Sequence, residues 1–434
     1  MSATIDNSQT RIVDPVFDKE NFRAEFRLPS DTVFQANMRL LNVGISSTAN
    51  DSYARTAGAL AAIRSIQLYD GAELLDQVTD METYASFLNL NKTNDDNLSV
   101  RRHLDYNALG FIQQGVTTYA GPQLGLGDMT FKTQNPVPDQ IVGGGASKTS
   151  WIDLRAILSF LKASMIVPTS LYRQLRLVIQ FKNAEQLKNS VVADRTAALK
   201  TLTGTILVAD EVAEGPLKEE MKKAYEGVRY EPTEFDRVIV PAVATAATSD
   251  ATRLVPVQSD FLMHGFQNKY LKKLLVVKKA TDQTTWVDGT KNTGYANMGS
   301  QACWDETLQV RVNGVNKLAG AGVVGKNRRL AMVTDCFGDI DMLPGQQLTN
   351  TQGFGTYVDG GAGDGLFKTQ GQVDFGGMTI EEYISTLQIF LKRSGVYQNT
   401  ELNQQLELIL AGRVTKAAVI DGSGRGYSIV YTRS

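Results

Sequence analysis

Apolar residues between 151 and 168 recur with the period of a helix. Leu154, Ile157, Leu158 and Leu161 are spaced three and four residues apart, which predicts one buried face of a short helix over residues 152–162. Asp153 stands where its side chain can cap this helix. Pro168 forbids its continuation, because proline lacks the backbone N–H that the next turn needs.

The pattern then changes to strict alternation, which predicts a β-strand within residues 171–181. One face would carry Leu175, Leu177 and Ile179, and the other Arg176, Val178 and Gln180. Similar alternation predicts strands at 25–28, 33–43 and 62–69 in the first half of the chain. Asp70-Gly71 is a strong turn signal after the last of these. A helix is expected over 79–90, and residues 110–150 have the composition of long surface loops.

The second half repeats this layout after a charged segment, residues 216–225, that predicts a helical connector ending at Gly227. Strands are expected at 237–240, 270–278, 307–312, 329–334, 386–392, 405–410 and 427–432. Long loops at 281–300 and 348–374 separate them. No repeat is visible residue by residue, but many short strands with few helices occur twice over. The chain therefore favours two tandem all-β sandwich domains.

Composition limits the classes of function. The chain has 434 residues, 42% of them hydrophobic, which suffices for two folded cores. Its 44 basic and 46 acidic residues are mixed along the sequence, so no basic field indicates direct genome binding. No apolar run approaches the roughly 20 residues that span a bilayer. With two cysteines and no signal-peptide pattern at residues 1–6, we expect folding in a reducing cell interior.

Residues of chemical interest are few and scattered. The two histidines, His103 and His264, have no partners at metal-ligand spacing, so zinc and acid–base chemistry are disfavoured. Cys303 and Cys336 are best interpreted as buried, unreactive thiols, with a redox pair as the alternative.

Four further kinds of motif have explanations that need no catalytic or binding chemistry. The segment 355–365, with Asp359 and Asp364, is typical of an exposed loop more than of a phosphate or calcium site. Residues 422–426 fit a hairpin turn, since glycine permits positive φ. The lysine-rich run 269–279 fits a strand whose lysines face solvent and guard an edge. Asn50, Asn91 and Asn97 begin Asn-X-Ser/Thr triplets, which are common by chance. No catalytic, cofactor-binding or metal-binding residue is proposed.

Two blocks resemble a known protein family. The helix-then-strand block 151–181, and the passage formed by 205–212 and 228–241, resemble double jelly-roll major capsid proteins of the polinton-like virus, virophage and adenovirus lineage. This resemblance implies an all-β fold of two tandem eight-stranded jelly rolls with short inserted helices. We expect an N-terminal arm at 1–16, a first jelly roll at 17–213, a connector at 214–228 and a second jelly roll at 229–434. The arm, polar and aperiodic, would be mobile or ordered only against a neighbour.

The same resemblance implies a non-enzymatic function. Homotrimers with a pseudo-hexameric outline would tile an icosahedral shell around a double-stranded DNA genome, with penton and minor capsid proteins as further partners and no cofactor. The protein would then be located in the virion. The alternative is a carbohydrate-binding or carbohydrate-processing β-sandwich, in which Trp151, Trp286 or Trp304 would stack on sugar rings.

Overall fold

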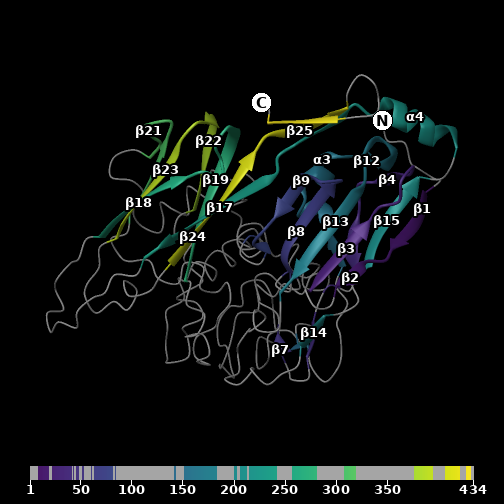
Figure 1. The fold of residues 1–434 in the computed structure, drawn as a ribbon, viewed down its shortest axis with the longest axis horizontal. Coiled ribbons are helices and arrows are strands. Elements are labelled where there is room, and N and C mark those ends of the chain that lie inside the picture. Colours follow the sequence, from purple (N-terminus) through teal and green to yellow (C-terminus); the bar gives the residue numbers. More distant parts are fainter. Residues whose placement is uncertain are drawn as a thin grey trace, which may run out of the picture.

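The computed structural model shows a β-rich molecule with a few short helices (Figure 1). It describes residues 8–18, 22–41, 43, 45–47, 51, 52, 60, 63–81, 84, 141, 142, 151–182, 200–202, 206–212, 215–241, 257–280, 307–318, 376–393, 406–420 and 427–431. The expected helix at 79–90 lies mostly outside these residues. The expected loops at 110–150, 281–300 and 348–374 and the expected strand at 329–334 also lie outside them, apart from residues 141 and 142.

The first barrel consists of two facing sheets. One sheet is built from β1 (Ser8–Val13), β4 (Val33–Gln35), β5 (Arg39–Leu41), β11 (Trp151–Asp153), β12 (Ile166–Pro168) and β15 (Ile206–Val212). Both β4 and β5 pair with β15, so the single strand expected at 33–43 is present as two parts, interrupted between Gln35 and Arg39. On their other side β4 pairs with β12 and β5 with β11.

The second sheet of this barrel has the order β2-β3-β13-β8-β9. Its strands are β2 (Val16–Asp18), β3 (Arg23–Arg27), β8 (Ile63–Asp70), β9 (Glu73–Val78) and β13 (Leu175–Phe181). The predicted alternation in β13 is confirmed, because Leu175, Leu177 and Ile179 are all buried. The predicted turn is confirmed too: Gly71, with φ +59°, joins β8 to β9 in a hairpin.

The predicted helix over 152–162 is wrong as a continuous element. Asp153 does cap a turn by accepting a hydrogen bond from Arg155 N, but this turn is the short 3-10 helix η3 (Leu154–Ala156). The backbone of Leu158 is extended, and α3 (Ser159–Ala163) then begins afresh. The physical reason is tertiary: Asp76 of β9 accepts hydrogen bonds from Phe160 N and Ser159 Oγ, which fixes a new helix start.

The remaining short elements of the first half complete the connections. They are β6 (Ile45–Ser47), β7 (Asp51–Ser52), β10 (Ile141–Val142), β14 (Lys200–Leu202) and the 3-10 helix η4 (Thr169–Leu171). β7 pairs with β10, and β6 with β14. The helix predicted at 216–225 is confirmed as α4 (Pro216–Ala224), which has proline in its first turn.

The second barrel is also made of two sheets (Figure 1). The first, in the order β17-β24-β19-β22, contains β17 (Thr233–Val240), β19 (Lys269–Ala280), β22 (Gly376–Ile384) and β24 (Leu406–Val414). The other, in the order β18-β23-β20-β21, contains β18 (Val257–Met263), β20 (Thr307–Val312), β21 (Val315–Asn316) and β23 (Leu387–Arg393). Of the seven strands expected in this half, six are confirmed, the last as β26 (Tyr427–Tyr431).

A long two-stranded ladder links the barrels. β16 (Gly227–Tyr230) pairs with β25 (Lys416–Ile420) in the register that β17 and β24 continue beyond Pro232 and Thr415. Val414 N donates to Pro232 O at 3.1 Å, so pairing persists through the bend. β26 adds to the free side of β25. We call β16, β25 and β26 the strap, because Figure 1 shows β25 running from the second barrel toward the first.

The N-terminal segment differs from the expected arm. β1 pairs with β15 over six residues, and β2 pairs with β3, so residues 8–13 and 16–18 are strands of the chain's own first barrel. The expectation that this segment is ordered only against a neighbour is therefore wrong for these residues. The sequence Ser8–Ile12 looked aperiodic because β1 exposes both faces and only Val13 reaches the core.

Candidate assembly surfaces and the junction between the barrels

The chemically interesting residues of the sequence do not converge on a site. His264 lies exposed in the turn between β18 and β19. His103, Cys303, Cys336, Asp359 and Asp364 lie outside the described residues, as do Asn50, Asn91 and Asn97. Within the ranges that the structure describes, no three His, Cys, Asp or Glu side chains gather as metal ligands do. β25 and β26 pair up to Ile420 and Tyr427, as the hairpin expected around 422–426 requires.

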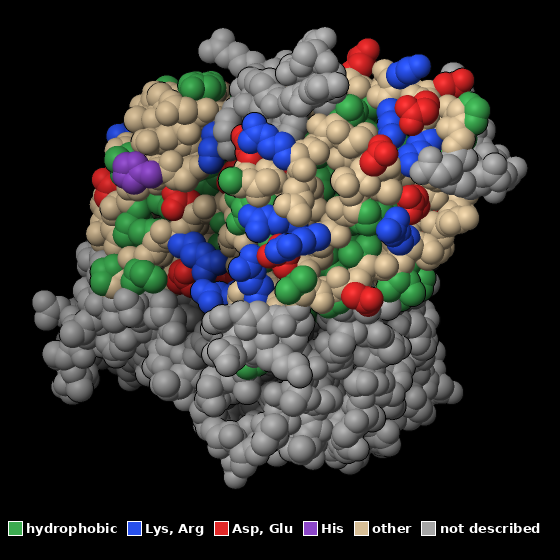
Figure 2. Space-filling view, turned by 45° about the vertical axis from the view of Figure 1, so that its right-hand side comes forward, with side chains coloured by type: hydrophobic (Ala, Val, Ile, Leu, Met, Phe, Trp, Pro, Cys, Tyr) green, Lys and Arg blue, Asp and Glu red, His purple; other side chains and the backbone are tan. Residues whose placement is uncertain are grey.

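The lysine-rich run 269–279 is a strand, but its predicted role at an edge is wrong. β19 lies inside its sheet, paired with β24 on one side and β22 on the other. Lys272 Nζ lies 2.7 Å from Glu231 Oε1, and Lys269 Nζ lies 3.7 Å from Glu234 Oε2. These lysines therefore serve local ion pairs. Figure 2 shows basic side chains gathered on the middle of one face with acidic ones among them.

Exposed apolar side chains concentrate on the edges of the sheets. Of ten large hydrophobic residues that are exposed in the described part, seven lie on edge strands: Ile12, Val16, Trp151, Ile239, Leu262, Val315 and Tyr383. An edge strand offers unpaired backbone N–H and C=O groups next to these side chains. The edges of both barrels therefore combine the two features that favour association with another chain.

The N-terminal edge of the first barrel carries two of these exposed residues. Ile12 on β1 is 58% exposed and Val16 on β2 is 62% exposed, and the two strands border the two sheets of the barrel. Figure 1 shows β1 and β2 on the side of the first barrel that faces away from the second. This side is a candidate surface for contact with a neighbouring molecule.

Trp151 occupies an edge position as well, which bears on the carbohydrate alternative. The residue is 41% exposed and lies in β11 rather than in a helix. The guanidinium carbon of Arg39 stands 5.2 Å from the ring centroid, so a cation–π contact already covers one face. Trp286 and Trp304 lie outside the described residues.

The junction between the barrels is a buried polar network inside an apolar seam. Tyr230 and Lys416 of the strap reach β9, where the Tyr230 hydroxyl donates to Leu75 O at 2.8 Å. The Lys416 ammonium donates to Leu74 O at 2.8 Å and to Leu75 O at 3.1 Å. Burial lowers the pKa of Lys416, since the interior disfavours its charge.

Asp76 stands on the same strand and joins this network to α3. Its carboxylate accepts hydrogen bonds from Phe160 N at 2.8 Å, Ser159 Oγ at 3.0 Å and Gln77 N at 2.8 Å. Desolvation nevertheless raises the pKa of Asp76 to about 6, although these bonds and the charge of Lys416 oppose the rise. The carboxyl group therefore titrates in mildly acidic solution.

Apolar residues of the second half extend the first core across the junction. Val228, Tyr230, Leu275, Ile409, Ala411 and Ala418 belong to the same buried cluster as the core of the first barrel. Leu274, Val276, Leu408 and Leu410 belong to the core of the second barrel. The sheet that contains β19 and β24 is thus buried on both faces, which holds the two barrels as one body.

Sequence reasoning did not find this junction. β16 and β25 were not among the predicted strands, and neither Asp76 nor Lys416 belongs to a motif. One signal was available: Val228-Arg-Tyr230 alternates and Ala417-Ala-Val419 is a short apolar run, and each lies directly next to a stronger strand. Their partners lie far away in the chain, however, and local patterns do not show such pairings.

Comparison with known proteins addresses the fold. No protein-family model and no curated protein sequence matches the chain. A chain from the cryo-EM structure of the Sputnik virophage matches with TM-score 0.58 and 11% identity, covering 99% of this chain and 89% of that one. PBCV-1 VP54, a crystal structure fitted into a reconstruction of Sputnik, gives TM-score 0.56 and 11% identity, with coverages of 98% and 97%.

A third match extends the range of viruses. The Faustovirus major capsid protein gives TM-score 0.50 and 8% identity, covering 95% of this chain and 90% of that chain. At such identities the likeness concerns the fold, and it spans nearly the full length of each protein. The expected class, all-β with two tandem jelly rolls and short helices, is confirmed. The chain has the double jelly-roll fold of virophage and giant-virus major capsid proteins.

Proposed function

We propose that this protein is a viral major capsid protein. Three copies would form a capsomer with a pseudo-hexameric outline, and capsomers would tile an icosahedral shell around a double-stranded DNA genome. The observation that carries the proposal is the fold shared with capsid proteins over 98% of this chain and 97% of PBCV-1 VP54.

The architecture supports this function physically. A tile must keep its shape when it is pressed against neighbours, and the sheet buried on both faces fixes one barrel against the other. A tile also needs side surfaces that associate with neighbouring tiles. Seven exposed hydrophobic residues lie on edge strands, where they can make such contacts. We assign these edges to contacts within and between capsomers, with a first barrel that starts at β1 and extends to about residue 213, a connector at 214–228 and a second barrel at 229–434.

Partners and location follow from the same proposal. The protein would act in the virion after synthesis in the host cell, with other copies of itself, penton proteins and minor capsid proteins as partners. We propose no catalytic role, no cofactor and no direct sequence-specific contact with nucleic acid, in keeping with the net charge of −2. None of the described helices is long and apolar enough to cross a bilayer.

The carbohydrate alternative is not favoured. The matched structures are of viral capsid components, and the one candidate stacking residue in the described ranges, Trp151, already contacts the Arg39 guanidinium. A sugar site would also need polar groups that converge beside the ring.

The test is the state of the purified protein. Light scattering after size exclusion should give three times the mass of one chain, and negative-stain microscopy should show trimers with a six-sided outline or closed shells. An interface of this obligate kind buries well over about 2,000 Å². A folded monomer that persists at micromolar concentration, without trimers or shells, would contradict the proposal.

A further inference from the structure

Three arginines of the first barrel share one glutamate. Arg23, Glu25 and Arg27 alternate along β3 with buried residues between them, so they lie on the same outer face of their sheet. Arg27 Nε donates to Glu25 Oε1 at 2.9 Å, and Arg23 Nη2 donates to Glu25 Oε2 at 3.2 Å. Arg176 of β13 is the direct partner of Arg27, and its Nη1 lies 3.8 Å from Glu25 Oε2. The four side chains therefore form one cluster.

This cluster is positively charged as a whole. Glu25 is the only carboxylate among the described residues within ion-pair distance of the three guanidiniums. Burial favours the neutral form of Glu25, but the guanidiniums of Arg27, Arg176 and Arg23 outweigh this effect and lower the pKa of its carboxyl group. Glu25 is thus ionised at neutral pH, and three positive charges against one negative charge leave a net charge of +2. Arg27 and Arg176 oppose each other directly, an arrangement that an added carboxylate would stabilise.

The middle of the cluster is held in place by the sheet. Arg176 Nε donates to Gly71 O at 3.2 Å, and the Arg176 guanidinium carbon lies 4.9 Å from the ring centroid of Tyr69, its direct partner on β8. The exposed Arg173 adds a further positive charge, because its side chain passes beside Gly71. We call Arg23, Glu25, Arg27, Arg173 and Arg176 the arginine face. Arginines that are already positioned lose less conformational entropy when they bind a partner.

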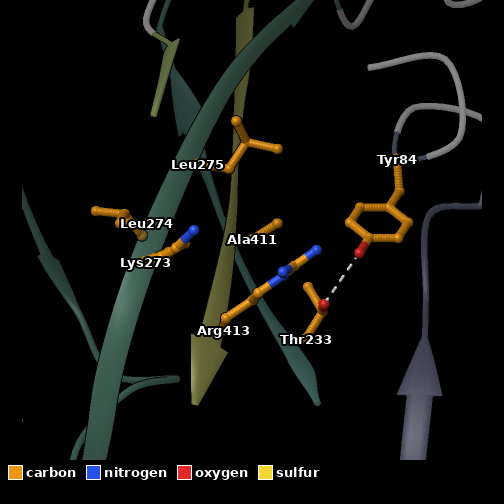
Figure 3. A pocket seen from close by; sticks show the side chains of 7 residues that line it. All are labelled: Tyr84, Thr233, Lys273, Leu274, Leu275, Ala411 and Arg413. Atoms are coloured by element: carbon orange, nitrogen blue, oxygen red, sulfur yellow. Dashed lines mark hydrogen bonds between the residues drawn. The ribbon is translucent and has the colours of Figure 1, made fainter. Parts of the chain in front are cut away.

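The arginine face is open to solvent. The side chain of Arg27 is 59% exposed, and among the described residues it donates only through Nε, so both Nη groups are left for a partner. The basic residues at the junction differ in this respect. Figure 3 shows Lys273 and Arg413 beside Tyr84 in a gap between the barrels, which has room for about one water molecule. A partner can therefore reach the arginine face but not these residues.

The composition of this face indicates a partner other than a second copy. None of the ten large hydrophobic residues that are exposed in the described part of the chain lies on β3, β8 or β13. Interfaces between permanently associated copies are more hydrophobic than this. Arginine and tyrosine, by contrast, are enriched in protein interfaces of every kind. A charged face with Arg176 on Tyr69 therefore fits a partner that binds and dissociates.

The same face suits carboxylates better than a nucleic-acid backbone. The planar fork of arginine matches the two oxygens of a carboxylate as it matches a phosphate. Proteins that bind DNA through its backbone contact roughly 6–10 phosphates, however, which is more than four arginines can reach. Glu25 at the centre of the face would also repel a continuous chain of phosphates. A short segment with a few carboxylates makes no such demand.

We propose that the arginine face binds an acidic peptide segment of a different protein. Arg27 and Arg23 would donate bidentate hydrogen bonds to its carboxylates, while Arg176 and Arg173 would supply further positive charge. The inference rests on the charges and the geometry of the first barrel, and it does not depend on the proposed capsid function.

The test measures fluorescence anisotropy of a labelled hexaglutamate peptide mixed with the full-length protein at pH 7.5. We expect saturable binding at about 50 mM sodium chloride and weaker binding at about 300 mM, because salt screens exposed charges. A labelled hexaglutamine peptide is the matched control and should not bind. Absence of saturable hexaglutamate binding, or equal binding of hexaglutamine, would overturn the proposal.

Variants tie the binding to the arginine face. Arg27→Gln should weaken hexaglutamate binding about tenfold, since it removes a charge-assisted bidentate contact. Arg27→Lys keeps the charge but not the fork, so its loss should be smaller. Arg229→Gln, at an exposed position of β16, is the matched control and should bind like the natural chain. Thermal unfolding checks that the variants are folded, and undiminished binding by folded Arg27→Gln would overturn the proposal.

Two further measurements examine the other possible occupants. A labelled DNA duplex that binds more tightly than hexaglutamate, and loses affinity in Arg27→Gln, would overturn the proposal in favour of nucleic acid. Light scattering compares the mass of the natural protein with that of Arg27→Gln. We expect equal masses, and a lower mass for the variant would show that a second copy occupies the arginine face instead.

Discussion

The hydroxyl of Tyr230 donates a hydrogen bond to the backbone carbonyl oxygen of Leu75 at 2.8 Å, across the boundary between the two barrels. Tyr230 is 3% exposed, and its ring packs edge-on against Phe160 of α3 with centroids 5.2 Å apart. A residue of the strap is thus anchored by both its polar and its apolar part in the first barrel. The two barrels are therefore expected to unfold together.

Tyr230→Phe tests the polar half of this anchor. The ring contact with Phe160 remains, and Leu75 O keeps its bond from Lys416, so no buried carbonyl is orphaned. We expect a loss of about 1 kcal/mol in the free energy of unfolding. Tyr270→Phe is the control, because its hydroxyl bonds to Glu381 O at an exposed site where water can replace it. Chemical denaturation of both variants measures their losses in free energy of unfolding. Equal losses would show that the junction hydrogen bond contributes no more to stability than the exposed one.

Leu158 tests the packing under the first barrel. It is fully buried at the start of α3, so Leu158→Asp would place an unpaired charge in the core. We expect loss of soluble, folded protein, and for the milder Leu158→Ala a cost of about 2–5 kcal/mol. Lys162→Ala, on the exposed side of α3, is the matched control. Soluble expression and thermal unfolding measure the effect, and a well-folded Leu158→Asp variant would mean that this face is not the core face.

Local patterns predicted the strands that bury one face cleanly. β13 and β20 were placed within a few residues, because alternating apolar residues and turn signals act over short distances. The helix at 152–162 failed although its leucines do reach the core. Its period fits η3 and α3 as well as it fits one helix, and the choice is made by Asp76, which lies far away in the sequence.

The junction could not be predicted for a similar reason. Whether Lys416 faces solvent or the carbonyls of Leu74 and Leu75 depends on how β25 crosses the first barrel. Lysine is usually exposed, so the sequence alone favours the wrong environment.

Asp76 should make stability depend on pH in mildly acidic solution. Its pKa is about 6 in the folded protein and near 3.8 when unfolded, so the folded state binds more protons between these values. The contribution of Asp76 to stability is therefore greatest below about pH 4. It falls as the pH rises toward 6 and stays constant at higher pH. The contribution of Asp76 to the free energy of unfolding changes by on the order of 2–3 kcal/mol across this range, because each pKa unit corresponds to about 1.36 kcal/mol.

Asp76→Asn isolates this contribution. The amide cannot ionise, and its oxygen can still accept the hydrogen bond from Phe160 N. Arginine partners lower the pKa values of Asp153 and Glu25, so these groups also make stability depend on pH. Their contributions are the same in both proteins and cancel in the comparison. We expect the difference in unfolding free energy between the variant and the natural chain to change by about 2–3 kcal/mol from pH 4 to pH 6.5. A difference that is constant across this range would refute the role of Asp76.

Ile12 and Val13 are neighbours on β1 that point in opposite directions, which makes them a matched pair for the proposed assembly edge. Val13 is 8% exposed and belongs to the first core, so Val13→Ser should lower the midpoint of unfolding by the equivalent of about 1–3 kcal/mol. Ile12 is 58% exposed, so Ile12→Ser should leave unfolding of the purified protein within about 0.5 kcal/mol of the natural value. If β1 meets a neighbouring capsomer, Ile12→Ser should instead reduce the yield of closed shells seen by electron microscopy. Normal shells from Ile12→Ser would remove this edge from the assembly surface between capsomers, while a large loss of stability of the purified protein would show that Ile12 is buried in a contact that forms before shells do.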